Sequence, residues 1–195
     1  YRFTKLFPLH EQFVDIFRQD IMVAKLPVLK EVLPIESMVR GAALFFYARR
    51  NYAKVRMQIA SAPQLFDTDA ATLNVWGNSC FFMGDYREAI EHYRHADLVE
   101  DASPKELSRL AVCYQRVNMP EKAIETLEDL LKKNPDNLTP LLKIAGVYME
   151  MKAFDEALSY LYKYEFSAPD GEKQVARLVA WCLLSKGDYE RARGY

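Results

Sequence analysis

The chain has 195 residues, of which 50% are hydrophobic and 27% are charged, an ordinary composition for a folded domain. Its 26 basic and 27 acidic residues give a net charge of -1, which lacks the basic excess that nucleic-acid binding requires. No apolar run is long enough to span a bilayer, so we expect no membrane span in this sequence.

The first 35 residues do not share the pattern of the rest of the chain. They are rich in apolar residues, and Phe13, Ile16 and Phe17 have helical spacing. We expect residues 1–35 to form an irregular, partly helical segment that packs on the unit that follows. Because the chain opens on Tyr1 and stops inside a helical pattern, we also expect it to be a fragment of a longer protein.

A period of 34 residues organises the remainder, residues 36–195. Small residues recur at this interval in two series. The series are Ala43, Gly77, Ala111 and Ala145, and Ala89, Ala123 and Ala157. The period divides the chain into units near 36–69, 70–103, 104–137 and 138–171, with a truncated unit at 173–195. A repeat of this length is typical of stacked helix–turn–helix units.

Each unit carries two apolar stripes with helical spacing, separated by a turn signal. In the second unit, Gly84 is expected to end the first helix in the left-handed conformation. Asn51 is the corresponding prediction in the first unit. Ser103 is expected to cap the helix that Pro104 begins. The fold class predicted is all-α, an α-solenoid of antiparallel helix pairs in which small side chains face large ones.

These residues resemble the tetratricopeptide repeat pattern over about residues 36–195. The match rests on Leu73, Trp76, Gly77, Gly84, Tyr86, Ala89, Tyr93 and Ala96, on Leu107, Leu110, Ala111, Tyr114, Ala123 and Pro135, and on Leu141, Ala145, Tyr148, Phe154, Ala157 and Pro169. The resemblance implies a right-handed superhelix whose first helices line a concave groove. It also implies a protein-interaction function, and no catalytic residues.

The resemblance further indicates which side chains would face that groove. The candidate partner-binding residues are Arg40, Leu44, Tyr47, Asn74, Asn78, Phe81, Phe82, Lys105, Arg109, Val112, Met149 and Trp181. Several of them are large and apolar at positions that nominally face solvent, a pattern that often marks a partner site. The alternative is that some of them pack between units.

Some members of the family clamp the terminal carboxylates of a peptide. Arg40, Lys105 and Arg109 stand at three of the basic clamp positions, and such donors can pair with carboxylates. However, Leu44 and Val75 stand where the clamp has asparagines. The sequence therefore departs from the clamp pattern at two of its positions.

No pattern indicates a metal, a cofactor or a catalytic site. His92 and His95 share one helix face, which we interpret as the solvated outer face of a second helix because no third ligand is evident. The cysteines, Cys80, Cys113 and Cys182, form no metal-binding or disulfide pattern and are expected to be buried thiols, which favours the cytoplasm. Phosphate-binding loops and nucleophile elbows are absent from the sequence.

The leading hypothesis is therefore a protein-interaction scaffold, and not an enzyme, that binds a peptide or partner helix in the groove. One alternative is an accessory repeat region of a larger enzyme or sensor whose catalytic part lies elsewhere. Another is self-association through exposed end units. The sequence does not identify the partner.

Overall fold

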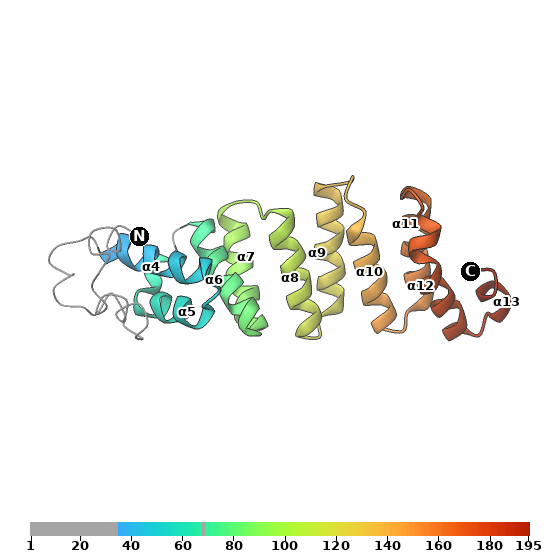
Figure 1. Cartoon of the computed structure of the whole chain (residues 1–195), viewed down its shortest axis with the longest axis horizontal. Helices are drawn as coiled ribbons and strands as arrows, with labels where there is room; N and C mark the ends of the chain where they lie inside the picture. Colours follow the sequence, from blue (N-terminus) through green and yellow to red (C-terminus); the bar gives the residue numbers. More distant parts are fainter. Residues whose placement is uncertain (1–34, 68) are drawn as a thin grey trace, which may run out of the picture. The chain divides into compact units, whose positions relative to one another are not determined.

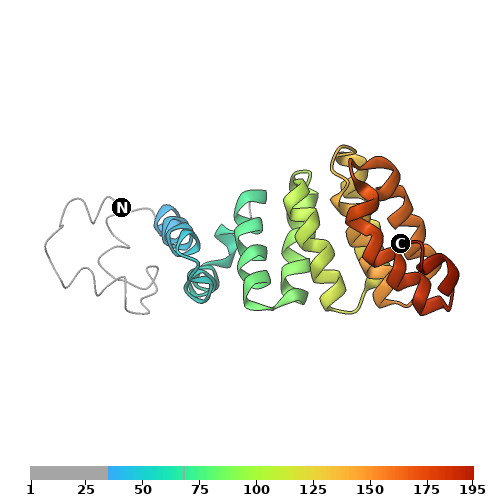
Figure 2. The same ribbon diagram turned by 45° about the vertical axis from the view of Figure 1, so that its right-hand side comes forward.

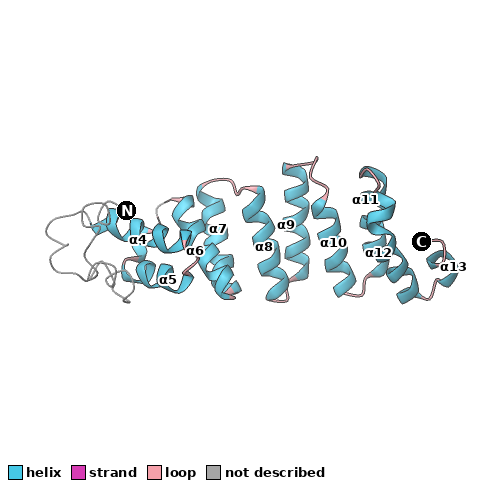
Figure 3. Ribbon diagram, in the orientation of Figure 1, coloured by secondary structure: helices cyan, strands magenta, loops and turns pink. Residues whose placement is uncertain are grey.

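The computed structural model describes residues 35–67 and 69–195. Within these residues it contains only helices and connecting loops (Figure 3). The chain divides into two compact units, Tyr1–Glu100 and Asp101–Tyr195. The all-α prediction is confirmed for the described residues. The predicted N-terminal segment lies outside them, apart from Ile35, where the first described helix begins.

We call the two compact units the first unit and the second unit, and we call the 34-residue units repeats. The first unit contains two helix pairs in its described part (Figure 1). α4 (Ile35–Ala48) pairs with α5 (Tyr52–Ser61), and α6 (Ala70–Met83) pairs with α7 (Tyr86–Val99). A short 3-10 helix, η2 (Pro63–Leu65), lies between the two pairs. α5 also contacts α6, and α4 contacts α6, so the first helices of consecutive pairs are neighbours.

The second unit continues the pattern with two full pairs and a shorter one. α8 (Pro104–Arg116) pairs with α9 (Pro120–Lys133), α10 (Thr139–Glu150) with α11 (Phe154–Ser167), and α12 (Gly171–Lys186) with α13 (Tyr189–Ala192). Contacts of α9 with α10, and of α11 with α12, join one pair to the next. Figure 2 shows these helices side by side from a second direction.

Small residues lie where the helices of a pair come closest. Ala43, Ala89, Ala123, Ala145 and Ala157 are completely buried. Gly77 of α6 faces the ring of Tyr93 of α7 so closely that an added Cβ would lie 3.1 Å from two ring carbons. The alternation of small and large side chains therefore brings the backbones of paired helices together, as close packing requires.

The helix ends follow the predicted turn chemistry with one exception. Gly84 ends α6 at a φ of 86°, and Ser103 and Glu106 form a capping box at the start of α8. The prediction that Asn51 is left-handed is wrong, because Arg50 takes that conformation at a φ of 57°. Asn51 instead caps α5, where its side chain accepts a hydrogen bond from the backbone N–H of Lys54.

Candidate functional site

Three predicted groove residues of the first compact unit, Tyr47, Phe81 and Phe82, belong to one chain of aromatic contacts. Tyr47 of α4 contacts Tyr52 of α5 edge-on, with ring centroids 6.0 Å apart. Tyr52 stacks on Phe82 of α6 at 4.7 Å, Phe82 meets Phe81 at 5.3 Å, and Phe81 meets Tyr86 of α7 at 5.9 Å. We call these five residues the aromatic row, and it links four helices.

The aromatic row is partly a packing device and partly a surface. Tyr47, Phe81 and Tyr86 are half-buried, whereas Phe82 keeps 46% of its area exposed. Leu44, on the same helix as Tyr47, is 51% exposed. Both interpretations of the sequence thus describe part of this set, since its aromatic residues pack across helix pairs while Leu44 and Phe82 present apolar area to solvent.

Two polar candidates of the first compact unit, Arg40 and Asn78, are engaged within the protein. The Arg40 guanidinium forms an ion pair with Asp69 at 3.1 Å. Asn78 is 7% exposed, and its side-chain carbonyl accepts a hydrogen bond from the Tyr93 hydroxyl at 2.7 Å. Asn74 is half-buried. Asn78 is therefore part of the interior of the hairpin, and Arg40 would have to exchange its partner to bind a ligand carboxylate.

The second unit presents its candidates on three first helices. Lys105 of α8 is exposed, and Arg109 and Val112 are half-buried. Met149 of α10 is half-buried and packs against the apolar cluster formed with α11 and α12. Trp181 of α12 is 47% exposed and meets Phe154 edge-on at 5.5 Å.

A pocket of the second unit opens between the first turns of α8 and α10. Lys105 and Lys143 line it, and the Lys143 ammonium donates a hydrogen bond to the Ser108 hydroxyl. Its lining comprises Pro104, Lys105, Ser108, Leu130, Asn137, Thr139, Pro140 and Lys143. Two ammonium groups and neutral donors suit a carboxylate or another anionic group.

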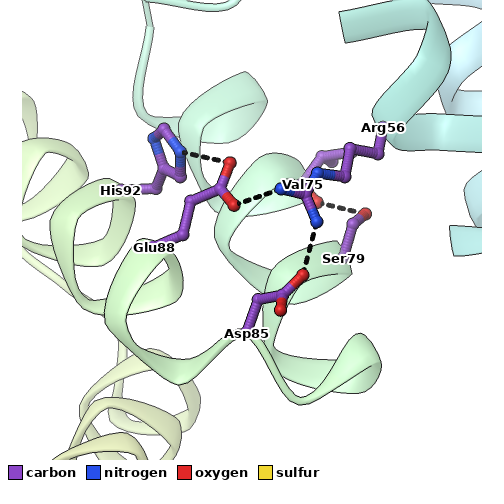
Figure 4. A network of polar contacts seen from close by, with 6 residues as sticks. All are labelled: Arg56, Val75, Ser79, Asp85, Glu88 and His92. Atoms are coloured by element: carbon purple, nitrogen blue, oxygen red, sulfur yellow. Dashed lines mark hydrogen bonds and ion pairs between the residues drawn. The ribbon is translucent and has the colours of Figure 1, made fainter. Parts of the chain in front are cut away.

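A polar cluster that the sequence did not predict lies between α5, α6 and α7 (Figure 4). Arg56 of α5 pairs with Asp85 and, through its second terminal nitrogen, with Oε2 of Glu88 at 2.8 Å. The other oxygen of Glu88 lies 3.9 Å from Nε2 of His92, one turn along α7. The Cys80 sulfur of α6, a Glu88 carboxylate oxygen and a His92 ring nitrogen all lie within 4.8 Å of one another.

The interpretation of His92 as part of a solvated outer face is wrong. Its side chain retains only 15% exposure and stacks on Trp76 of α6, with ring centroids 3.9 Å apart. Burial lowers the pKa of this imidazole, and the Glu88 carboxylate opposes that effect. His95, by contrast, is more exposed, and its Nδ1 lies 3.0 Å from a carboxylate oxygen of Asp67.

The cysteines lie in the interior, as predicted. All three are free thiols and completely buried. Burial raises the pKa of Cys113 to about 12, and burial together with the Glu88 charge raises that of Cys80 to about 12. In their thiol forms Cys113 and Cys182 serve as small apolar side chains.

One signal in the sequence could have revealed the Cys80, Glu88 and His92 group. Glu88 and His92 are four residues apart, so they share a helix face. The buried Ala89 and Ala96 lie beside that face, which places Glu88 and His92 at the border of the buried side of the helix. Counting along the 34-residue repeat would then have placed Cys80 of the first helix opposite both. The two histidines alone pointed to the wrong pair.

A comparison with models of protein families matches about half of the chain. A sequence model described as tetratricopeptide repeat matches residues 83–137 and 118–182, which together span 100 of the 195 residues.

No helix in the described part of the chain combines the length and apolarity needed to cross a membrane.

Solved structures of MamA share the fold. A crystal structure of MamA aligns with a TM-score of 0.70 at 16% identity and covers 83% of this chain and 87% of that chain. MamA 41-end from Desulfovibrio magneticus RS-1 aligns at 0.68 and 13% identity, covering 83% and 91%. MamA AMB-1 aligns at 0.65 and 19%, covering 80% and 85%. At these identities the likeness concerns the fold alone.

Proposed function

Because this chain belongs to the tetratricopeptide repeat family, we propose that it binds a peptide or an amphipathic partner helix on the surface of its first helices. The family supports the role of a protein-interaction scaffold in general. The finer assignment, to the first-helix surface, depends on which apolar side chains these helices expose. We propose no catalytic step for the chain, and we keep a cytoplasmic location as a prediction.

The observation that carries the proposal is the exposed pair Leu44 and Phe82. They stand on α4 and α6, the contacting first helices of consecutive pairs. Each keeps about half of its area in solvent, although the aromatic row beside Phe82 is otherwise engaged in packing. Large apolar side chains left exposed next to an ordered aromatic set suit the apolar face of a helix or the side chains of an extended peptide.

The second unit offers a separate set of contacts on its own first helices. Trp181 and Leu184 of α12 are both about half exposed. Tryptophan is prominent among the residues that dominate binding energy at interfaces. The Lys105 and Lys143 ammonium groups, in the pocket between α8 and α10, would favour acidic residues in a ligand segment.

The test compares variants that differ only in which face loses an apolar side chain. Leu44→Asp changes the proposed surface, and Leu98→Asp changes an 85% exposed leucine on the second helix α7. Partners recovered with the parent chain are identified, and their binding segments are synthesised and titrated against both variants. We expect Leu44→Asp to weaken binding by about tenfold or more, and Leu98→Asp to leave it unchanged.

Equal binding by the parent chain and Leu44→Asp would contradict the proposal. Circular dichroism of both variants shows whether the fold is retained. Phe82→Ala supplies a second variant for the same surface, with Phe166→Ala, at a 95% exposed position, as its control. Self-association remains a prediction, and light scattering over a range of concentrations checks it, because a self-associating chain would gain mass as concentration rises.

A further inference from the structure

We propose that Cys80, Glu88 and His92 bind a transition-metal ion, with Zn²⁺ the best match, and that this ion would join α6 to α7. The site is separate from the surface assigned above. It draws one ligand from the first helix of the second repeat and two from its second helix. The following observations support it.

The geometry of the three side chains suits a tetrahedral ion. The Cys80 sulfur, a Glu88 carboxylate oxygen and a His92 ring nitrogen all lie within 4.8 Å of one another. A tetrahedral ion with bonds of about 2.0–2.3 Å places its ligand atoms about 3.3–3.8 Å apart. Small side-chain rotations would therefore bring the three atoms to bonding positions without moving the helices.

The chemistry of the donors also fits. A thiolate, an imidazole and a carboxylate are all zinc ligands, and a site with three protein ligands keeps its fourth position for water. Cys80 is buried, whereas the side chains of Glu88 and His92 retain 30% and 15% exposure. The group thus has an interior side that excludes solvent and an outer side through which an ion and a water molecule could enter.

Neighbouring residues already orient two of the ligands. Oε2 of Glu88 accepts a hydrogen bond from Arg56 at 2.8 Å, which leaves Oε1 directed at His92 (Figure 4). The distance from Oε1 to Nε2 of His92 is 3.9 Å, too long for a hydrogen bond but suitable for two atoms that share an ion. Trp76 stacks on the His92 ring and fixes its plane. Such outer contacts are typical of metal sites.

The equivalent three positions in the other full 34-residue repeats hold no such set of metal ligands. They carry Phe46, Lys54 and Gln58, then Tyr114, Lys122 and Thr126, and then Tyr148, Glu156 and Tyr160. These side chains meet across their hairpins, since Lys54 and Lys122 lie over the rings of Phe46 and Tyr114, and Tyr148 stacks on Tyr160. Cys80 takes the place of an aromatic ring, so among the four full repeats only the second has a ligating sulfur atom at this position.

Binding requires one proton transfer. The Cys80 thiol gives its proton to solvent as the sulfur forms its bond to the ion, while Glu88 binds as carboxylate and His92 through a neutral nitrogen. The oxidation states of the Cys80 sulfur and of the ion do not change in this step. The Arg56 guanidinium would remain on Oε2 of Glu88 and would partly compensate the negative charge of the ligands.

The first experiment uses Co²⁺ as a spectroscopic probe on the untagged chain. We expect a thiolate-to-cobalt charge-transfer band together with tetrahedral d–d absorption, at a stoichiometry of one ion per chain. Titration with Zn²⁺ should displace Co²⁺ from the site, so that both absorption features disappear. Cys80→Ala should abolish the charge-transfer band and weaken Zn²⁺ binding by about tenfold or more, as should His92→Gln.

Two matched variants separate this site from incidental metal binding. Cys113→Ala removes another buried thiol, and His95→Gln removes the more exposed histidine of the same helix as His92. Both should retain the parent spectrum and affinity. A parent chain without the charge-transfer band, or a Cys80→Ala variant that keeps it, would overturn the proposal.

A second measurement needs no substitution in the ligands. Mass spectrometry of the parent chain after alkylation in mild denaturant should show that added Zn²⁺ protects Cys80 more strongly than it protects the buried Cys113, which gains only from the stabilisation of the fold. Because the ion would bind the folded chain, Zn²⁺ should also raise the thermal midpoint of the parent. Equal alkylation of Cys80 with and without Zn²⁺ would count against the site even if a ligand variant failed to fold.

Discussion

The Tyr93 hydroxyl donates a 2.7 Å hydrogen bond to the side-chain carbonyl of Asn78, and this bond joins α7 to α6 in the interior of the first unit. Both residues are almost fully buried, at 2% and 7% exposure. A buried donor and acceptor that satisfy each other make a small net contribution, but removing one leaves the other without that partner at a larger cost. The pair therefore fixes the register of the two helices.

Tyr93→Phe should lower the free energy of unfolding by about 1–3 kcal/mol, because the ring remains while the bond to Asn78 is lost. Urea denaturation measures the change. Tyr189→Phe is the control. Because Tyr189 is 69% exposed, loss of its hydroxyl group should change the free energy of unfolding by less than about 0.5 kcal/mol. A Tyr93→Phe variant as stable as the control would show that the bond does not fix the register.

Two glycines should respond to alanine in opposite directions. At Gly77 an added Cβ would lie 3.1 Å from carbons of the Tyr93 ring, and the hydrogen bond to Asn78 prevents that ring from yielding. Gly77→Ala should therefore destabilise the chain by about 1–3 kcal/mol. At Gly146, within α10, no atom beyond the neighbouring residues and backbone of its own helix lies within 4 Å of the added Cβ, so Gly146→Ala should stabilise the chain by about 0.5–1 kcal/mol.

Thermal and urea unfolding of both glycine variants provide the measurement. Opposite signs are the expected result, because both sites are helical and differ in the space around the new methyl group. Destabilisation of similar size at both positions would contradict the close contact of α6 with α7 as the cause.

Tyr160 should make stability depend on pH in the alkaline range. Burial, together with its 2.6 Å hydrogen bond to Glu128, raises its pKa above the ordinary value of 10.0 in the folded chain. The neutral phenol is thus favoured by folding, so its contribution is complete below pH 10 and is lost as the pH rises towards the folded pKa. The parent chain should lose stability above pH 10 more steeply than Tyr160→Phe.

Urea titrations at several pH values between 8 and 11 test this difference. The relevant quantity is the slope of the unfolding free energy against pH, since other tyrosines and lysines titrate in both proteins and cancel in the comparison. Parallel slopes for the parent chain and Tyr160→Phe would mean that Glu128 does not hold the phenol in its neutral form.

The sequence predicted the hairpins because local and global signals agree in them. Ala89 and Ala123 recur at the repeat length, and turn residues such as Gly84 end helices where the apolar stripes stop. The misplaced left-handed residue shows the limit of this reasoning. The left-handed residues Gly84, Asn118 and Lys152 recur at intervals of 34 residues, and Arg50 stands one interval before Gly84. The repeat register and not the residue type therefore selects the left-handed position, and Asn51, one residue later, caps α5.

The candidate site was less accessible to sequence reasoning, because exposure depends on contacts between helix pairs. Phe81 and Phe82 are adjacent in sequence and each contacts a tyrosine of another helix, yet Phe81 is half-buried and Phe82 keeps 46% of its area exposed. Asn78 occupied a nominal groove position and turned inward to meet Tyr93. The partners that decide these outcomes come from other helices, and their side-chain orientations are not encoded in spacing along one helix.

The start of α8 offers a test of local stability in the second unit. Oγ of Ser103 accepts a hydrogen bond from the Glu106 backbone N–H, and the Glu106 carboxylate accepts one from the Ser103 N–H at 2.8 Å. Each satisfies a backbone donor at the helix start. Ser103→Ala should therefore lower the unfolding free energy by about 1 kcal/mol, and Glu106→Ala should have a smaller effect.

Because the two bonds form one reciprocal motif, the double variant should lose less than the sum of the single losses. A double-mutant cycle in urea measures this coupling. Ser103→Asp is the rescue variant, since its carboxylate can accept the same bond and favours the positive end of the helix dipole, so it should restore most of the lost stability. Strict additivity in the cycle, or failure of Ser103→Asp to rescue, would show that Pro104 alone fixes the start of α8.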